Sequence, residues 1–349
     1  MSANIFCMPR DAKIGIINRG EAAIRFIRAA KEYNAIHETN FSSVVFHTED
    51  ESDALFVREA DYAVPFSSLS EFSGPAGSAY LNRKLIIKAL KISGCSAAWA
   101  GWGFLSEDAL FVKMLEDENF VFLGPSSKSM KLLGDKITAK TLAEGNGVPI
   151  LKWSRGPVKS VNDARRSADE IGFPCIIKAA NAGGGRGIRV VRQPEELASL
   201  FRSALDETRR ITGGEVIFME QMVEVVRHLE VQAVADGFGT ILTFGVRDCS
   251  VQRRNQKIIE ETPPPNLPGS VMQAMEKSAA ALLKAADYKS AGTVEFLYDL
   301  KNGGFYFMEV NTRLQVEHPI TEQMYGIDLV QYQIQIALGE KLDESQPIP

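Results

Sequence analysis

Two glutamates occupy matched positions in what reads as a β-hairpin. Residues 292–299 and 305–311 are largely apolar strand candidates, with a turn signal at Asn302 between them. If the turn centres on Asn302, residues equally far from it face each other, and Glu295 and Glu309 are such a pair. Like charges placed opposite each other destabilise paired strands, so we expect a cation between them. Oxygen ligands favour Mg²⁺ or Mn²⁺. The alternative is an exposed pair or an offset register.

Four polar side chains follow at every second position: Asn311, Arg313, Gln315 and Glu317. All four would point one way if the chain stayed extended. Such a group is costly to bury without a ligand. Arg313 could hold an oxyanion through two N–H groups, and Glu317 could act as a base beside it. A solvated edge strand is the alternative, which the closeness to Glu309 disfavours.

A lysine and a glycine run suggest a phosphate site. Lys178 lies near the end of an apolar strand, and Gly183, Gly184, Gly185 and Gly187 follow it. Glycines let backbone N–H groups converge on an anion, and the lysine adds positive charge. The segment lacks the Gly-Lys-Ser/Thr ending of a P-loop. A flexible surface hairpin is the alternative.

A basic and polar segment, 247–257, follows another apolar strand. Charged residues usually form a solvated face, and that interpretation competes with one in which Lys257 and its neighbours attract anionic substrates. His228 is one of four histidines, and a lone histidine is more often structural than catalytic.

The elements that must position these residues divide into units. Strand candidates that alternate with helices across residues 1–123 predict a parallel sheet. Residues 124–149 read as a helical linker. Short strands and helices in 150–221 predict a small mobile lid, and residues 222–349 contain strand candidates at 228–235, 240–247, 292–299 and 305–311.

Composition narrows the class of protein. The 349 residues carry a net charge of −5, which argues against non-specific nucleic-acid binding. We find no apolar run of membrane-spanning length and no signal-peptide core at the start. Four cysteines without metal-binding spacing (Cys7, Cys95, Cys175 and Cys249) predict unpaired thiols and a cytoplasmic location.

Taken together, the motifs resemble those of biotin carboxylases, the ATP-grasp component of acetyl-CoA, propionyl-CoA and pyruvate carboxylases. The matching segments are I-N-R-G-E-A-A-I-R at 17–25, G-W-G-F-L-S-E at 101–107, L-G-D-K at 133–136, I-I-K-A-A-N-A-G-G-G-R-G-I-R-V-V at 176–191, R-H-L-E-V-Q at 227–232, R-D-C-S-V-Q-R-R-N-Q-K at 247–257 and M-E-V-N-T-R-L-Q-V-E-H-P-I-T-E at 308–322. W-A-G-W-G at 99–103 is closer to the large fused acetyl-CoA carboxylases. The resemblance implies an α/β and α+β fold, with a Rossmann-like parallel sheet followed by an ATP-grasp fold with a small mobile lid.

The resemblance also implies roles for individual residues. The ATP-binding set is Lys136, Lys178, Gly183, Gly184, Gly185, Gly187, Glu220, Gln221, Val223, His228, Gln252, Asn255 and Leu297. The metal ligands are Glu295, Glu309 and Asn311. The bicarbonate and biotin pocket is Lys257, Arg313, Gln315, Val316 and Glu317, of which Lys257, Arg313 and Glu317 are catalytic.

The implied reaction is ATP- and bicarbonate-dependent carboxylation of biotin on a carrier. Glu317 would deprotonate bicarbonate, which attacks the γ-phosphate to give carboxyphosphate. Phosphate from its breakdown would deprotonate biotin, while Arg313 stabilises the enolate that takes up carbon dioxide. The implied partners are a biotin carboxyl carrier protein or domain and a carboxyltransferase, with a homodimer as one option and no role for nucleic acid or membrane.

Three departures from the family pattern bear on activity. Asn255 stands where the family usually has histidine, and Asn181 and Ala182 stand where it has more glycine. The chain ends at Pro349, whereas the family's third domain continues, so we expect a C-terminally incomplete protein. Two alternatives stay open: another ATP-grasp ligase, such as a carbamoyl-phosphate synthetase-like enzyme, and a nucleotide-binding fragment that cannot carboxylate.

Overall fold

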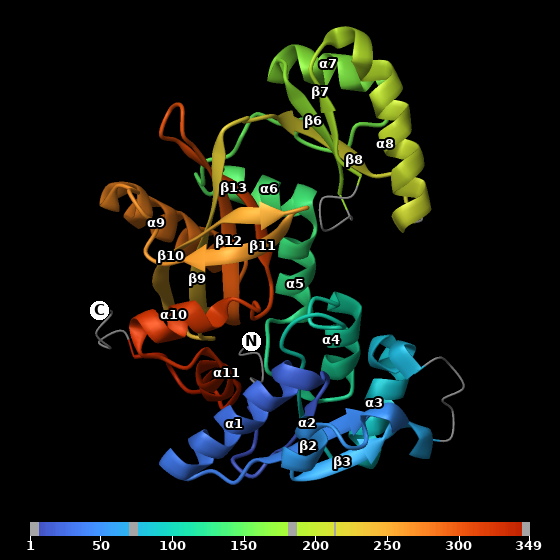
Figure 1. The fold of residues 1–349 in the computed structure, drawn as a ribbon, viewed down its shortest axis with the longest axis vertical. Coiled ribbons are helices and arrows are strands. Elements are labelled where there is room, and N and C mark those ends of the chain that lie inside the picture. The colour runs from blue at the N-terminus through green and yellow to red at the C-terminus, as the bar shows by residue number, and fades with distance from the viewer. Residues whose placement is uncertain (1–6, 70–75, 181–186, 213, 344–349) are drawn as a thin grey trace, which may run out of the picture.

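The computed structural model describes residues 7–69, 76–180, 187–212 and 214–343. Three sheets organise these residues, in strand orders β3-β2-β1-β4-β5, β7-β6-β8 and β11-β10-β9-β12-β13. Figure 1 shows the first sheet at the bottom, the three-stranded sheet at the top and the third sheet between them.

The N-terminal sheet is parallel throughout, as the alternating pattern predicts. Its strands are β1 (Lys13–Ile16), β2 (Ser42–His47), β3 (Tyr62–Pro65), β4 (Ala97–Trp99) and β5 (Val121–Phe122). Its helices are α1 (Gly20–Ile36), α2 (Leu55–Glu59), α3 (Arg83–Ile92) and α4 (Ala109–Asp117), with short 3₁₀ turns η1 (Glu49–Glu51), η2 (Phe66–Ser68) and η3 (Ala76–Leu81). The sequence did not predict β3.

The linker forms two helices, α5 (Ser127–Gly134) and α6 (Lys136–Gly145), where the sequence indicated one helical stretch. Asp135 divides them because it leaves the helical conformation, at ψ 116°, and its side chain accepts the backbone N–H groups of Ile137 and Thr138. This cap places Lys136 at the first position of α6.

The unit with the three-stranded sheet contains α7 (Val161–Ile171), β6 (Cys175–Ala179), β7 (Arg189–Val191), η4 (Pro194–Glu196), α8 (Leu197–Thr212) and β8 (Ile217–Gln221). Strand β6 lies in the middle, antiparallel to both neighbours. The unit has an apolar core of its own, which includes Ile177, Phe201 and Met219. Residues 181–186, which include the predicted loop glycines Gly183, Gly184 and Gly185, lie outside the described residues.

The C-terminal unit is an antiparallel sheet. Its strands are β9 (Val226–Ala235), β10 (Ile241–Arg253), β11 (Gln256–Glu261), β12 (Ser290–Asp299) and β13 (Phe305–Asn311). Its helices are α9 (Gly269–Ala285), α10 (His318–Tyr325) and α11 (Leu329–Ala337). Helix α9 packs on β9 through Met275 and Leu282, whereas α11 lies against α1 (Figure 1) and shares the N-terminal core.

Two sequence expectations about this unit are wrong. Strand β10 does not stop at Arg247 but runs on to Arg253, so the start of the polar segment belongs to the sheet. The chain is extended only as far as Asn311. It then bends at Arg313 and turns at 316–317 into α10, whose second residue is Pro319. Proline is favoured in the first helical turn, where its missing N–H costs nothing.

Three cysteines, Cys95, Cys175 and Cys249, are buried free thiols, as the sequence predicts. Among the described residues, no helix is long and apolar enough to cross a membrane. The domain limits drawn at residues 123, 149 and 221 remain predictions.

One buried amide joins the N-terminal and C-terminal units. The Gln333 carbonyl accepts the indole N–H of Trp99 at 2.9 Å, and its NH₂ group donates to the Leu123 carbonyl at 3.2 Å and to Ser290 Oγ at 3.1 Å. Gln333 lies on α11, Trp99 on β4 and Ser290 on β12. The tryptophan that sets W-A-G-W-G apart thus helps to dock the two units.

We predict that Gln333→Met lowers the free energy of unfolding by roughly 2 kcal/mol, because it leaves the buried Trp99 N–H unpaired. Gln331→Met on the same helix removes only contacts of 3.5 Å and should cost less than about 0.5 kcal/mol. Urea denaturation of both variants checks this. Equal losses would show that the amide contributes nothing specific.

Candidate active site

Four charged residues form one row across the C-terminal sheet. Arg247 on β10 pairs with Glu230 on β9, Glu230 pairs with Glu295 on β12, and Glu295 pairs with Glu309 on β13. Residues directly opposite each other in an antiparallel sheet project from the same face. The predicted pairing of Glu295 with Glu309 is therefore confirmed. The register shifts next to it, so the symmetric turn assumed from the sequence does not hold near the hairpin tip.

Lys257, on the edge strand β11, extends its ammonium group to two members of this row and to Glu317. Its Nζ lies 2.6 Å from Glu230 Oε2, 3.1 Å from Glu295 Oε1 and 2.6 Å from Glu317 Oε1. An ammonium has three N–H groups, and all three are engaged. Burial lowers the pKa of Lys257, but the three carboxylates outweigh it and raise that pKa well above its usual value. Lys257 therefore stays charged at any physiological pH.

Glu295 receives hydrogen bonds on both oxygens. Asn311 Nδ2 and Gln315 Nε2 donate to Oε1 at 2.7 and 3.2 Å. On the other side, Gln252 donates to His228 Nδ1 at 2.7 Å, so His228 Nε2 carries the proton that it donates to Glu295 Oε2 at 2.9 Å.

Glu309 forms an ion pair with a lysine other than Lys257. Lys136 Nζ, at the start of α6, lies 2.7 Å from Glu309 Oε2. Burial raises the pKa of Glu309, but the charge and hydrogen bond of Lys136 outweigh it and lower that pKa below the usual range. The three predicted metal-binding residues, Glu295, Glu309 and Asn311, thus lie together, and their carboxylate and amide oxygens suit Mg²⁺ or Mn²⁺.

The segment after β13 brings in Gln315 and Glu317 but not Arg313. Gln315 is buried, with its NH₂ group toward Glu230 and Glu295, and Glu317 contacts Lys257. Arg313 turns to Glu107 of the N-terminal unit, at 3.0 Å from Nε to Oε2, although its Nη2 still reaches Asn311 Oδ1 at 3.1 Å. The expectation that all four side chains point one way fails because the chain bends at Arg313.

A second charged group joins the lid to the linker. Glu220 on β8 contacts Lys178 on β6 and, at 2.8 Å, Lys140 on α6. Burial raises the pKa of Glu220, but the two lysines outweigh it and lower that pKa to about 2. Lys140 is almost fully buried, at 2% exposure, and the sequence analysis missed it.

The remaining predicted nucleotide residues differ in their placement. Leu297 lies directly opposite His228 in the sheet, while Gln221 and Val223 are half-buried at the end of β8 and just beyond it. Gly187 has φ of 72°, and its N–H contacts Glu207 at 3.3 Å. Asn255 is exposed in the β10–β11 turn, and no contact among the described residues joins it to the cluster.

Sequence reasoning missed Glu230, Arg247 and Glu107. A signal for Glu230 was present, because His228, Glu230 and Gln232 alternate along an apolar strand and so share one face. A solvated face was one of two interpretations of the segment that contains Arg247, but this side chain is wholly buried. Its burial depends on strands and a helix that are distant in sequence.

His318, next to Glu317, is buried against Trp102. The backbone carbonyl of Gln315 can only accept, so His318 Nδ1 donates to it at 2.7 Å. Burial outweighs this hydrogen bond and lowers the pKa of His318 from 6.5 to about 4. Folding therefore favours the neutral imidazole of His318. The contribution of this residue to the free energy of unfolding is complete above pH 6.5 and is lost as pH falls from 6.5 toward 4.

We predict that the wild-type chain loses about 2 kcal/mol more unfolding free energy than His318→Asn between pH 7.5 and 5. Asparagine keeps an N–H donor but does not titrate. Urea denaturation at both pH values measures the difference. His228, whose pKa is raised, is common to both chains and cancels. Parallel pH profiles would rule out the buried neutral imidazole.

Comparison with known proteins identifies the family to which this chain is similar. Residues 10–130 match the family model "Biotin carboxylase, N-terminal domain", and residues 135–345 match "Carbamoyl-phosphate synthase L chain, ATP binding domain". The chain is 43% identical over 334 residues to a chloroplastic biotin carboxylase of Arabidopsis thaliana, covering 96% of this chain and 60% of that protein. It is 42% identical to a biotin carboxylase of Nostoc, covering 96% and 72%.

Solved structures agree. A biotin carboxylase–ATP-analogue complex from Campylobacter jejuni superposes with a TM-score of 0.89 at 39% identity, covering 95% of this chain and 72% of that one. Pyruvate carboxylase of Rhizobium etli gives 0.86 at 36% identity, covering 96% and 29%. The predicted Rossmann-like and ATP-grasp fold class is confirmed. Because residues 10–130 match the biotin carboxylase model, and because the sequence over 96% of the chain and the fold match biotin carboxylases, the chain belongs to the biotin carboxylase family.

Proposed function

We propose that this chain is an ATP-dependent ligase that carboxylates biotin on a carrier protein, using bicarbonate and releasing ADP and phosphate. The observation that carries the proposal is Lys257, half-buried and held among Glu230, Glu295 and Glu317. The Campylobacter relative is described as a complex with an ATP analogue, and a 2-oxoglutarate carboxylase domain from Hydrogenobacter thermophilus as a complex with MgADP and bicarbonate. The chain spans 60% of the length of the Arabidopsis relative, so the activity of the whole protein remains a proposal.

The nucleotide would lie between the lid and the C-terminal sheet. Lys136 and Lys178 would contact the phosphates. Each is held by one carboxylate, Lys136 by Glu309 and Lys178 by Glu220. A triphosphate competes for such lysines by charge, and Glu220 retains Lys140 when Lys178 leaves. Lys140 therefore keeps the buried Glu220 ionised during the exchange. Gln221, Val223 and Leu297 would contact the adenine.

Glu295, Glu309 and Asn311 would hold a divalent cation. The three residues lie on one face of the β12–β13 hairpin, and carboxylate and amide oxygens are ligands that such an ion prefers. When bound, Mg²⁺ or Mn²⁺ would neutralise charge on the phosphate oxygens.

Bicarbonate would bind by exchange at Lys257. Since all three of its N–H groups contact carboxylates, an anion gains one only when a carboxylate gives it up. Glu317 would then be released beside the anion and free to accept its proton, the role of a general base. The deprotonated anion would attack the γ-phosphate, in agreement with the implied carboxyphosphate route.

Biotin would approach from the side of Val316, which is 57% exposed. This residue lines a cavity of about 1090 Å³ together with Trp102, Phe104 and His318. Aromatic walls suit a fused ring system. Arg313 would leave Glu107 to stabilise the enolate oxygen. A carrier protein or domain, a carboxyltransferase and a homodimer are the proposed partners, and the cytoplasmic location stays a prediction.

A different ATP-dependent ligase is the second candidate, because residues 135–345 match a carbamoyl-phosphate synthase domain model. A nucleotide-binding fragment is the third, favoured by the exposed Asn255 in place of the family's histidine. Dependence on biotin separates the first two, and ATP binding without turnover identifies the third.

We expect phosphate release from MgATP to require bicarbonate, to rise with free biotin and to fall by about 10²- to 10⁴-fold in Glu317→Gln, which cannot accept a proton. A colorimetric phosphate assay measures this. Glu261→Gln changes an exposed carboxylate on the same sheet and should behave as wild type. Release that ignores biotin, or that survives Glu317→Gln, would contradict the proposal.

A further inference from the structure

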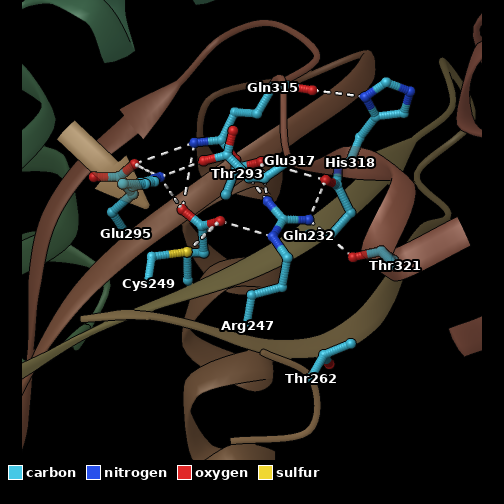
Figure 2. A network of polar contacts seen from close by, with 12 residues as sticks. Gln232, Arg247, Cys249, Thr262, Thr293, Glu295, Gln315, Glu317, His318 and Thr321 are labelled. Atoms are coloured by element: carbon cyan, nitrogen blue, oxygen red, sulfur yellow. Dashed lines mark hydrogen bonds and ion pairs between the residues drawn. The ribbon is translucent and has the colours of Figure 1, made fainter. Parts of the chain in front are cut away.

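Arg247 is a buried charge that none of the roles above uses. It is 0% exposed, as is its partner Glu230, and it lies at one end of the charged row, behind the cluster that holds Lys257. Figure 2 shows its guanidinium surrounded by polar side chains from several parts of the chain. Burying a guanidinium costs several kcal/mol unless it is fully paired, and an apolar residue would usually pack here at less cost.

All five N–H groups of Arg247 have acceptors. The acceptors are Glu230 Oε1 (2.7 Å from Nε), Gln232 Oε1 and Thr321 Oγ1 (2.8 and 2.9 Å from Nη1), and Gln315 Oε1 and Thr293 Oγ1 (2.6 and 3.4 Å from Nη2). They come from β9, β12, α10 and the segment that carries Gln315. Because the guanidinium is planar and rigid, it imposes one geometry on all of them.

Arginine can only donate, and this decides which way the Gln315 amide points. Its carbonyl oxygen must face Arg247, so its NH₂ group faces Glu230 Oε2 at 3.3 Å and Glu295 Oε1 at 3.2 Å. With the opposite orientation, the amide would bring an oxygen toward two carboxylates and an NH₂ toward a guanidinium. Both contacts would be repulsive.

The orientation of the Gln315 amide decides which donors face the carboxylates of the cluster. Gln315 Nε2 and Lys257 Nζ donate to the same two carboxylates, Glu230 and Glu295. Both groups are therefore donors aimed into one site. An anion that displaces a carboxylate therefore meets N–H groups of both Gln315 and Lys257.

We propose that Arg247 is a positioning residue for anion binding: it holds the Gln315 carbonyl so that the Gln315 NH₂ group and Lys257 together present donors to bicarbonate. This inference rests on the proposed function for the identity of the anion. Within the described part of the chain, no hydrogen bond or ion pair joins Arg247 to Glu317 or to the predicted nucleotide residues. A lysine at this position would keep the charge that Glu230 needs but has only three N–H groups, without a planar fork.

The test compares Arg247→Lys with Arg247→Met and with the control Thr321→Val. The control removes one of the same five acceptors on the α10 side, away from Gln315. Isothermal titration of bicarbonate and, separately, of MgATP gives the affinities. We expect both Arg247 variants to bind bicarbonate at least tenfold more weakly, with MgATP affinity changed less than about threefold. Thr321→Val should lower the melting temperature yet bind bicarbonate as wild type. Arg247→Lys decides the matter if Arg247→Met does not fold.

Retained bicarbonate affinity in Arg247→Lys would overturn the inference, since charge alone would then suffice. Parallel losses of bicarbonate and MgATP affinity would also overturn it, because a general structural defect predicts them. A measurement made without any ligand separates the proposed role of Arg247 from the proposed function. The side-chain NH₂ protons of Gln315, followed by NMR, should resist solvent exchange in wild type and Thr321→Val but not in the Arg247 variants. If the wild type binds MgATP but no bicarbonate, the proposed function fails, and the Gln315 protons still decide the role of Arg247.

Discussion

Three carboxylates placed side by side across one sheet are the constraint on which the rest of the site depends. Glu230, Glu295 and Glu309 face the same side of neighbouring strands and would repel one another. Cationic and neutral donors resolve that repulsion, with Arg247 and Lys257 on Glu230, and Lys136 on Glu309. A sheet that concentrates negative charge in this way is organised around the positive groups it can bind.

The same arrangement explains how one surface could accept an anion and a cation. Each lysine predicted to contact a substrate is already paired with a carboxylate, as Lys257 is with Glu317 and Lys178 with Glu220. In the proposed function, substrate binding would exchange one ionic partner for another and would leave few buried charges unpaired. Lys140 and Arg247 differ from these lysines because they are buried, where they pair with Glu220 and Glu230, and no substrate role is proposed for them. They fix the framework around which the exchange takes place.

Much of the fold was readable from local pattern. Apolar runs alternating with helices predicted the parallel N-terminal sheet, and the hairpin of β12 and β13 was placed with its glutamates opposed. The strand β3 was missed because Tyr62–Pro65 is short and poorly buried. The bend at Arg313 was missed because two-residue spacing cannot show where a strand ends. Proline at the second position of α10 was the available signal.

The sequence by itself indicated the family, through the resemblance of its motifs. It also determined the main helices and strands and most of the polar residues at the site, because these depend on residue type and on periods of two or 3.6. Tertiary structure alone decided which charges meet. Arg247 contacts Thr321 and Gln315, and Lys140 contacts Glu220, across separations that no local pattern encodes. A buried charge is stable only with its partners in place, so its role emerges when distant strands and helices pack together.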